Sequence, residues 1–108
     1  MTDVVPIAEQ AFESEVLASA LPVLVDFRAD WCLPCRLVEP VLAELAAELA
    51  GAIRFVAIDA DASPDLVRRC GVVALPTLQL WRCGELVTAL SGAHPKGVLR
   101  DEIVGSLG

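Results

Sequence analysis

The chain has 108 residues, a length that suits one compact domain spanning residues 1–108. Hydrophobic residues make up 56% of the sequence, enough for a core without disulfide staples, and no apolar run approaches the roughly 20 residues of a transmembrane helix. The formal net charge of -7 argues against nucleic acid or an anionic membrane as a partner, because both attract basic surfaces.

The apolar pattern of the first third predicts two strands around a helix. A short strand covers residues 4–7, where Pro6 favours an edge position, and a helix follows at residues 9–19. The tight apolar run at residues 22–27 indicates a strand buried on both faces, and Asp26 interrupts it.

The middle of the chain predicts a long helix, a strand and a short helix. The long helix covers about residues 32–49 and holds Pro40 inside it, and the strand covers residues 53–58. Ser-Pro-Asp at residues 63–65 predicts the start of the short helix, with the Ser63 hydroxyl as N-cap and an end near Gly71.

The last third predicts strands at residues 77–81 and 86–90, joined by a hairpin turn at Cys83-Gly84, and a final helix that His94-Pro95 opens. Strands separated by helices pair in parallel, whereas a hairpin is antiparallel. The order of elements therefore predicts an α/β fold in which four helices flank a mixed five-stranded central sheet.

The chain has four cysteines, and their use depends on whether the protein works in an oxidising or a reducing compartment: Cys32, Cys35, Cys70 and Cys83. Disulfide frameworks belong to secreted chains with poor cores, but this chain has a rich core. Its first residues also lack the basic and apolar regions of a signal peptide. We therefore expect a cytoplasmic protein with reactive or metal-binding thiols.

The segment Trp31-Cys32-Leu33-Pro34-Cys35 follows a buried strand and opens the long helix. Two sulfurs on one helical turn can form a disulfide, and the helix N-terminus favours the Cys32 thiolate. Pro34 stiffens this first turn. We expect the Cys32 thiolate to attack a substrate disulfide and Cys35 to resolve the mixed disulfide, which leaves a reduced substrate and a Cys32–Cys35 disulfide.

A zinc site is the alternative interpretation of this cysteine pair. Zinc needs two further ligands at matching spacing. Cys70 and Cys83 form no second C-x-x-C, and His94 is the single histidine. We therefore expect no metal.

The chain resembles the thioredoxin family over essentially its whole length. The segments that carry the resemblance are Val25-Asp26-Phe27, Trp31-Cys32-Leu33-Pro34-Cys35, Pro40, Asp59-Ala60-Asp61, Leu75-Pro76-Thr77, Gly84-Glu85 and Ser91-Gly92-Ala93. The resemblance implies the thioredoxin fold and protein-disulfide reductase activity without a bound cofactor. It also implies a monomer that receives electrons from NADPH through a flavin-dependent thioredoxin reductase and passes them to disulfide-containing client proteins.

The resemblance implies a substrate-docking surface as well. Pro76 would be a cis-proline beside the cysteines, and the backbone of Leu75 would pair with an extended substrate chain. The other members of this surface would be Trp31, Leu33, Ala74, Gly92 and Ala93. Ordinary loop packing is the alternative for Ala74 and Leu75.

Asp26 is a carboxyl group inside an apolar strand, so burial should raise its pKa. The resemblance assigns it the role of general base toward Cys35. A structural carboxyl group bonded to the backbone or to water is the alternative.

Three residues near the site depart from the family pattern. Leu33 replaces the usual glycine, which widens the apolar surface and leaves the redox potential open. Arg28 replaces a large aromatic residue, and we expect it to pair with Asp61 and lower the pKa of Cys32, unless it is a surface arginine without such a partner. Ala57 replaces a lysine, so Asp26 lacks that charge partner.

Two questions stay open at this point. We expect Cys70 and Cys83, the latter in a hairpin turn, to be ordinary reduced thiols, and a regulatory or dimer-forming role for Cys70 is the alternative. The same sequence could also serve an oxidase or isomerase, a binding subunit without redox chemistry, or a metal module. The intact C-x-x-C together with Asp26 and Pro76 argues against the binding subunit.

Overall fold

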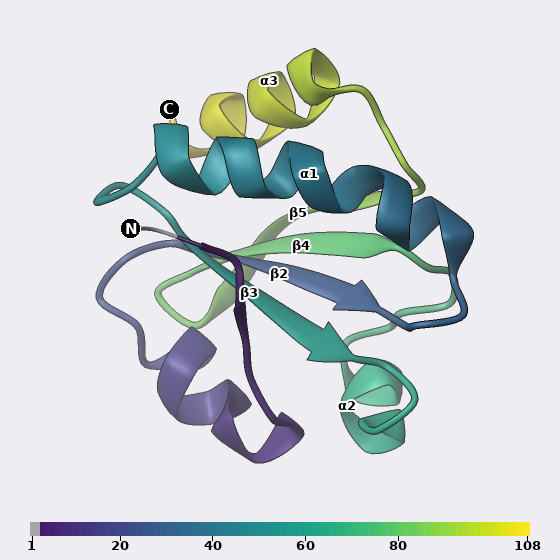
Figure 1. The fold of residues 1–108 in the computed structure, drawn as a ribbon. Helices are drawn as coiled ribbons and strands as arrows, with labels where there is room; N and C mark the ends of the chain where they lie inside the picture. Colours follow the sequence, from purple (N-terminus) through teal and green to yellow (C-terminus); the bar gives the residue numbers. More distant parts are fainter. Residues whose placement is uncertain (1–2) are drawn as a thin grey trace.

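The computed structural model describes residues 3–108 and contains one mixed sheet of five strands in the order β1-β3-β2-β4-β5 (Figure 1). Strands β1, β3 and β2 pair in parallel, whereas β2 with β4 and β4 with β5 pair antiparallel. The strands cover Val5–Pro6 (β1), Val23–Arg28 (β2), Arg54–Asp59 (β3), Thr77–Arg82 (β4) and Glu85–Ser91 (β5). The predicted mixed sheet is confirmed, and Pro6 lies in an edge strand.

Helices cover both faces of the sheet. Helix α1 (Leu33–Glu48) and helix α3 (Lys96–Leu107) lie together on one face (Figure 1). Helix α2 (Pro64–Arg69) and the N-terminal helical segment lie on the other face. Together they are the four predicted helices. Within residues 3–108, no helix has both the length and the apolar character needed to cross a membrane.

The N-terminal helical segment differs from the regular helix predicted at residues 9–19. It consists of a 3-10 turn at Glu9–Ala11 (η1) and a π-helical turn at Glu13–Leu17 (η2). The Phe12 ring between them packs edge-on against Trp81 of β4, with ring centroids 5.5 Å apart. In so short a segment, tertiary packing of this kind outweighs helical propensity.

The start of α2 also differs from its prediction. Ser63 occupies the N-cap position, but its side chain makes no capping hydrogen bond. The Leu66 N–H instead donates to Glu9 Oε2 at 3.1 Å. A carboxylate from a distant segment therefore satisfies a free backbone donor at this helix start.

Alternation along the strands separates two cores. One core lies between the sheet and helices α1 and α3, and its residues include Leu24, Val38, Leu42, Leu45, Phe55, Leu78, Leu99 and Ile103. The other lies on the α2 side and includes Phe12, Val16, Val23, Val25, Phe27, Val56, Ile58 and Leu66. Asp26 follows Leu24 by two residues, so it faces α1.

Candidate active site

Cys32 and Cys35 form a disulfide at the start of α1, with Cα atoms 5.3 Å apart. Cys32 is the N-cap of α1, and the Cys35 N–H donates to Cys32 Sγ at 3.2 Å. Cys35 is fully buried, and Cys32 is 3% exposed. A free backbone donor therefore faces the sulfur of Cys32, which is the arrangement that stabilises a thiolate at a helix N-terminus.

Two large apolar side chains flank the disulfide on the surface. Trp31 is 70% exposed and Leu33 is 65% exposed. The Trp31 Nε1–H donates to Asp61 Oδ2 at 2.7 Å, which fixes the indole ring. Pro34 lies in the first turn of α1, as predicted.

The loop before β4 approaches the same disulfide. The Leu75–Pro76 peptide bond is cis, as the resemblance implies. Leu75 packs against the cluster of Ala29, Cys32 and Cys35. The Gly92 N–H donates to the Pro76 carbonyl oxygen at 2.9 Å, so residues 92–93 lie beside this loop.

A shallow groove of about 490 Å³ extends from this loop toward α2. Its lining includes Trp31, Ala74 and Leu75 of the predicted docking surface. It also includes Val73, which is 96% exposed and was missed from the sequence. An apolar side chain beside the predicted Ala74-Leu75 loop was the available signal.

The Asp26 side chain lies between strand β2 and helix α1, and the residue is 2% exposed. Burial raises its pKa from 3.8 to about 7, although Arg28 lowers this value and Glu39 raises it. Among the described residues, Asp26 Oδ1 has no hydrogen-bond partner. The predicted raised pKa is thus present, and a carboxyl group with this pKa can exchange a proton near neutral pH.

The geometry agrees with comparisons to known proteins. The thioredoxin family model matches residues 3–104. The thioredoxin of Pyropia yezoensis is 42% identical over 93 residues, which cover 86% of this chain and 87% of that protein. The thioredoxin of Thiocapsa roseopersicina is 46% identical over 83 residues, which cover 77% and 91%.

The chain belongs to the thioredoxin family. It is a protein thiol–disulfide oxidoreductase, because it has the family's fold together with a Cys32–Cys35 pair that closes into a disulfide. A further relative, the thioredoxin of Mycobacterium bovis, is 40% identical over 99 residues, which cover 92% of this chain and 85% of that protein.

The predicted ion pair between Arg28 and Asp61 is wrong. Arg28 forms an ion pair with Glu39 of α1, and Asp61 instead accepts the Trp31 hydrogen bond. The reason is strand alternation, since Arg28 lies two residues after Asp26 and faces α1 with it. The alternative, a surface arginine without a partner, does not describe Arg28 either, because its half-buried side chain pairs with Glu39.

Glu39 is the second residue that sequence reasoning missed. It lies four residues after Cys35 on α1, and such pairs share a helix face. That spacing was the available signal. Ala57 of β3 is the parallel-strand partner of Asp26 in β2. The position where the family pattern has a lysine therefore lies next to Asp26, and here it carries no charge.

The other two cysteines lie outside the disulfide. Cys70 is half-buried at the C-terminal end of α2, and burial raises the pKa of its thiol, although Arg69 lowers it. Cys83 is exposed in the hairpin turn, with φ 53°. In the part of the chain that the structure describes, no group of three or more His, Cys, Asp and Glu side chains is arranged to hold a metal ion.

Proposed function

We propose that this thioredoxin-family protein is a monomeric, single-domain cytoplasmic reductase of client-protein disulfides. Its electrons would come from NADPH through a flavin-dependent thioredoxin reductase, with no cofactor bound to the chain itself. The observation that carries this proposal is the Cys32–Cys35 disulfide at the start of α1, where the Cys35 N–H donates to Cys32 Sγ. This position lowers the free energy of the thiolate that must attack.

In the first step, the Cys32 thiolate attacks one sulfur of a client disulfide. A Cys32–client bond forms as the client disulfide breaks, and the other client sulfur leaves as a thiolate that takes a proton from solvent. Trp31 and Leu33 support this step, because their exposed side chains offer the client an apolar surface on either side of Cys32.

In the second step, Cys35 gives its proton to the Asp26 carboxylate and attacks Cys32 Sγ. The Cys35–Cys32 bond forms, the Cys32–client bond breaks, and the client sulfur leaves as a thiolate. Two electrons have then passed from the dithiol to the client, and the reductase returns two electrons to the disulfide. The pKa of Asp26, raised to about 7, supports its role as the base.

The docking site for the client is the groove beside the disulfide. An extended client segment would pair with the main chain of Leu75, as in strand addition. Within residues 3–108, no hydrogen bond engages the Leu75 N–H or C=O group. Ala74, Pro76, Gly92 and Ala93 would complete the contact.

The test is dithiothreitol-driven reduction of a protein disulfide by the parent protein and by two single variants. We expect Cys32→Ser to fall to the rate of dithiothreitol alone. Cys35→Ser, reduced beforehand and mixed with the client after dithiothreitol is removed, should accumulate a covalent client adduct on non-reducing gels. The matched control is the Cys70→Ser, Cys83→Ser double variant, which should keep the parent rate. Full activity of Cys32→Ser would overturn the proposal and favour a binding subunit.

A further inference from the structure

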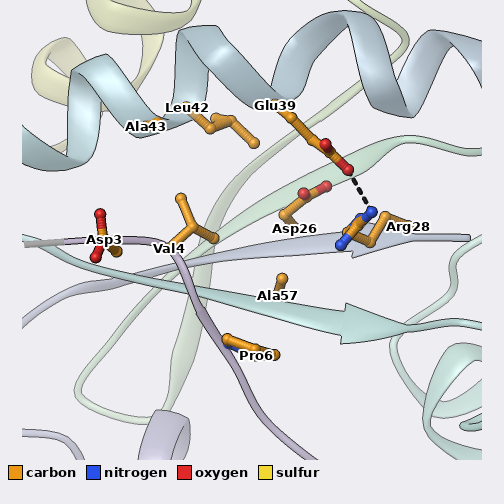
Figure 2. A pocket seen from close by; sticks show the side chains of 9 residues that line it. All are labelled: Asp3, Val4, Pro6, Asp26, Arg28, Glu39, Leu42, Ala43 and Ala57. Atoms are coloured by element: carbon orange, nitrogen blue, oxygen red, sulfur yellow. Dashed lines mark ion pairs between the residues drawn. The ribbon is translucent and has the colours of Figure 1, made fainter. Parts of the chain in front are cut away.

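A cavity of about 270 Å³ lies between β2, β3 and α1, and the Asp26 carboxyl group forms part of its wall (Figure 2). Among the described residues, its charged lining groups are Asp3, Asp26, Arg28 and Glu39. The β3 side contributes Ala57, which leaves that wall uncharged. Besides burial, the charges that act on Asp26 are those of Arg28 and Glu39.

The Arg28–Glu39 ion pair closes one end of this cavity (Figure 2). Arg28 comes from the same strand face as Asp26, and Glu39 comes from the helix that covers it. The two side chains are 31% and 41% exposed, so solvent screens them incompletely. Within residues 3–108, Arg28 Nε is buried without a hydrogen-bond partner, so the contact with Glu39 engages only the Nη2 end of the guanidinium.

The two charges of the pair act on Asp26 in opposite directions. The guanidinium favours the ionised carboxylate by attraction, and Glu39 disfavours it by repulsion. Glu39 also binds the guanidinium and so reduces the attraction that Arg28 exerts. Neutralising Glu39 alone should therefore lower the pH at which Asp26 releases its proton, and neutralising Arg28 alone should raise it.

We propose that Arg28 and Glu39 are positioning residues whose ion pair adjusts the pH at which the buried Asp26 releases its proton. The proposal rests on the proposed function, in which Asp26 accepts the Cys35 proton. The neighbouring elements contribute few other charges: Leu78 of β4 pairs with Asp26 and is apolar, and the disulfide of α1 is uncharged. Asp3 is the remaining charged group on the cavity wall.

The direct test follows the Asp26 carboxyl resonance by NMR against pH in the oxidised full-length protein. We expect Glu39→Gln to lower the midpoint by about half a pH unit or more, because the guanidinium is then unopposed. Arg28→Gln should raise the midpoint by a similar amount, because Glu39 is then unpaired. The double variant should return close to the parent, and Arg28→Lys should keep most of the parent behaviour.

Two controls separate local from general charge effects. Glu44→Gln removes a carboxylate from the same helix, but Glu44 pairs with Lys96 at 2.9 Å and does not line the cavity. It should leave the Asp26 midpoint unchanged. Asp3→Asn measures the contribution of the third cavity carboxylate, which we expect to be smaller than that of Glu39.

The proposal fails if the Glu39→Gln and Arg28→Gln midpoints stay at the parent value or move in the same direction. Chemical shifts of the remaining amides report whether each variant keeps the parent fold, and the Arg28→Lys variant repeats the test with the charge retained. The pH profile of the Cys35 step should follow the NMR midpoints. If Asp26→Asn leaves that step unaffected while the midpoints move as expected, the base role fails and the ion-pair proposal stands.

Discussion

Asp26 shows how one buried group links proton chemistry to stability. Its pKa is about 7 in the folded protein, against the usual 3.8, because burial penalises the carboxylate. The folded state therefore binds this proton more tightly than the unfolded state does. The stabilisation from Asp26 is fully present below pH 3.8, declines as the pH rises toward 7, and is lost above that value.

We expect Asp26→Asn to remove this pH dependence. Asparagine has nearly the same shape and no charge, so at pH 8 the variant should exceed the parent in unfolding free energy by about 2–4 kcal/mol. At pH 4 the two proteins should be nearly equal. Urea unfolding of the oxidised proteins at pH 4, 6 and 8 measures this difference. Asp101→Asn, at an exposed site on α3, is the control, and an Asp26→Asn gain that stays constant across the three pH values would contradict the argument.

At the scale of one element, α2 shows that a short helix can begin with help from elsewhere in the chain. The six residues Pro64–Arg69 are too few to form a stable helix by themselves. Glu9 accepts the Leu66 N–H, although the local Ser63 was the residue expected to cap the helix. The N-terminal segment and α2 therefore stabilise each other.

We expect Glu9→Ala to lower the unfolding free energy by about 1 kcal/mol, the typical cost of a lost cap. Glu9→Gln should cost less, because it retains an oxygen that accepts the Leu66 N–H. Ser63→Ala should cost less than Glu9→Ala, since the serine side chain makes no capping bond. Denaturant unfolding measures all three. A larger loss in Ser63→Ala than in Glu9→Ala would restore the cap predicted from the sequence.

At the scale of the whole molecule, α1 and α3 cover one face of the sheet through apolar contacts and ion pairs. Leu99 and Ile103 of α3 are buried in the core that α1 shares. Lys96 of α3 reaches Glu44 and Glu48 of α1 at the surface. Burial of apolar side chains contributes far more to stability than exposed ion pairs do, so the core should dominate the attachment of α3.

We expect Leu99→Ala to lower the unfolding free energy by about 2–5 kcal/mol, because it leaves a cavity in a closed core. Lys96→Gln should have little effect, and that effect should shrink in high salt. Unfolding in low and high salt measures both variants. A Lys96→Gln loss as large as that of Leu99→Ala would show that the ion pairs hold the layer together.

The local patterns of the sequence were sufficient for most elements and for the disulfide. Alternating and helical periods placed the strands and helices, and their order implied the mixed sheet. Cys32 and Cys35 are three residues apart at a helix start, so their proximity is a local property. Asp26 stood out as a charge within an apolar run, and its burial followed from that run.

Tertiary structure alone decided which charges surround Asp26 and how two helical segments are built. Arg28 and Glu39 belong to different elements and meet because β2 and α1 pack face to face. Glu9 reaches Leu66 for the same kind of reason, and Phe12 packs on Trp81 of a distant strand. Period and spacing describe which residues share a face, whereas the partner across the layer depends on how complete elements pack.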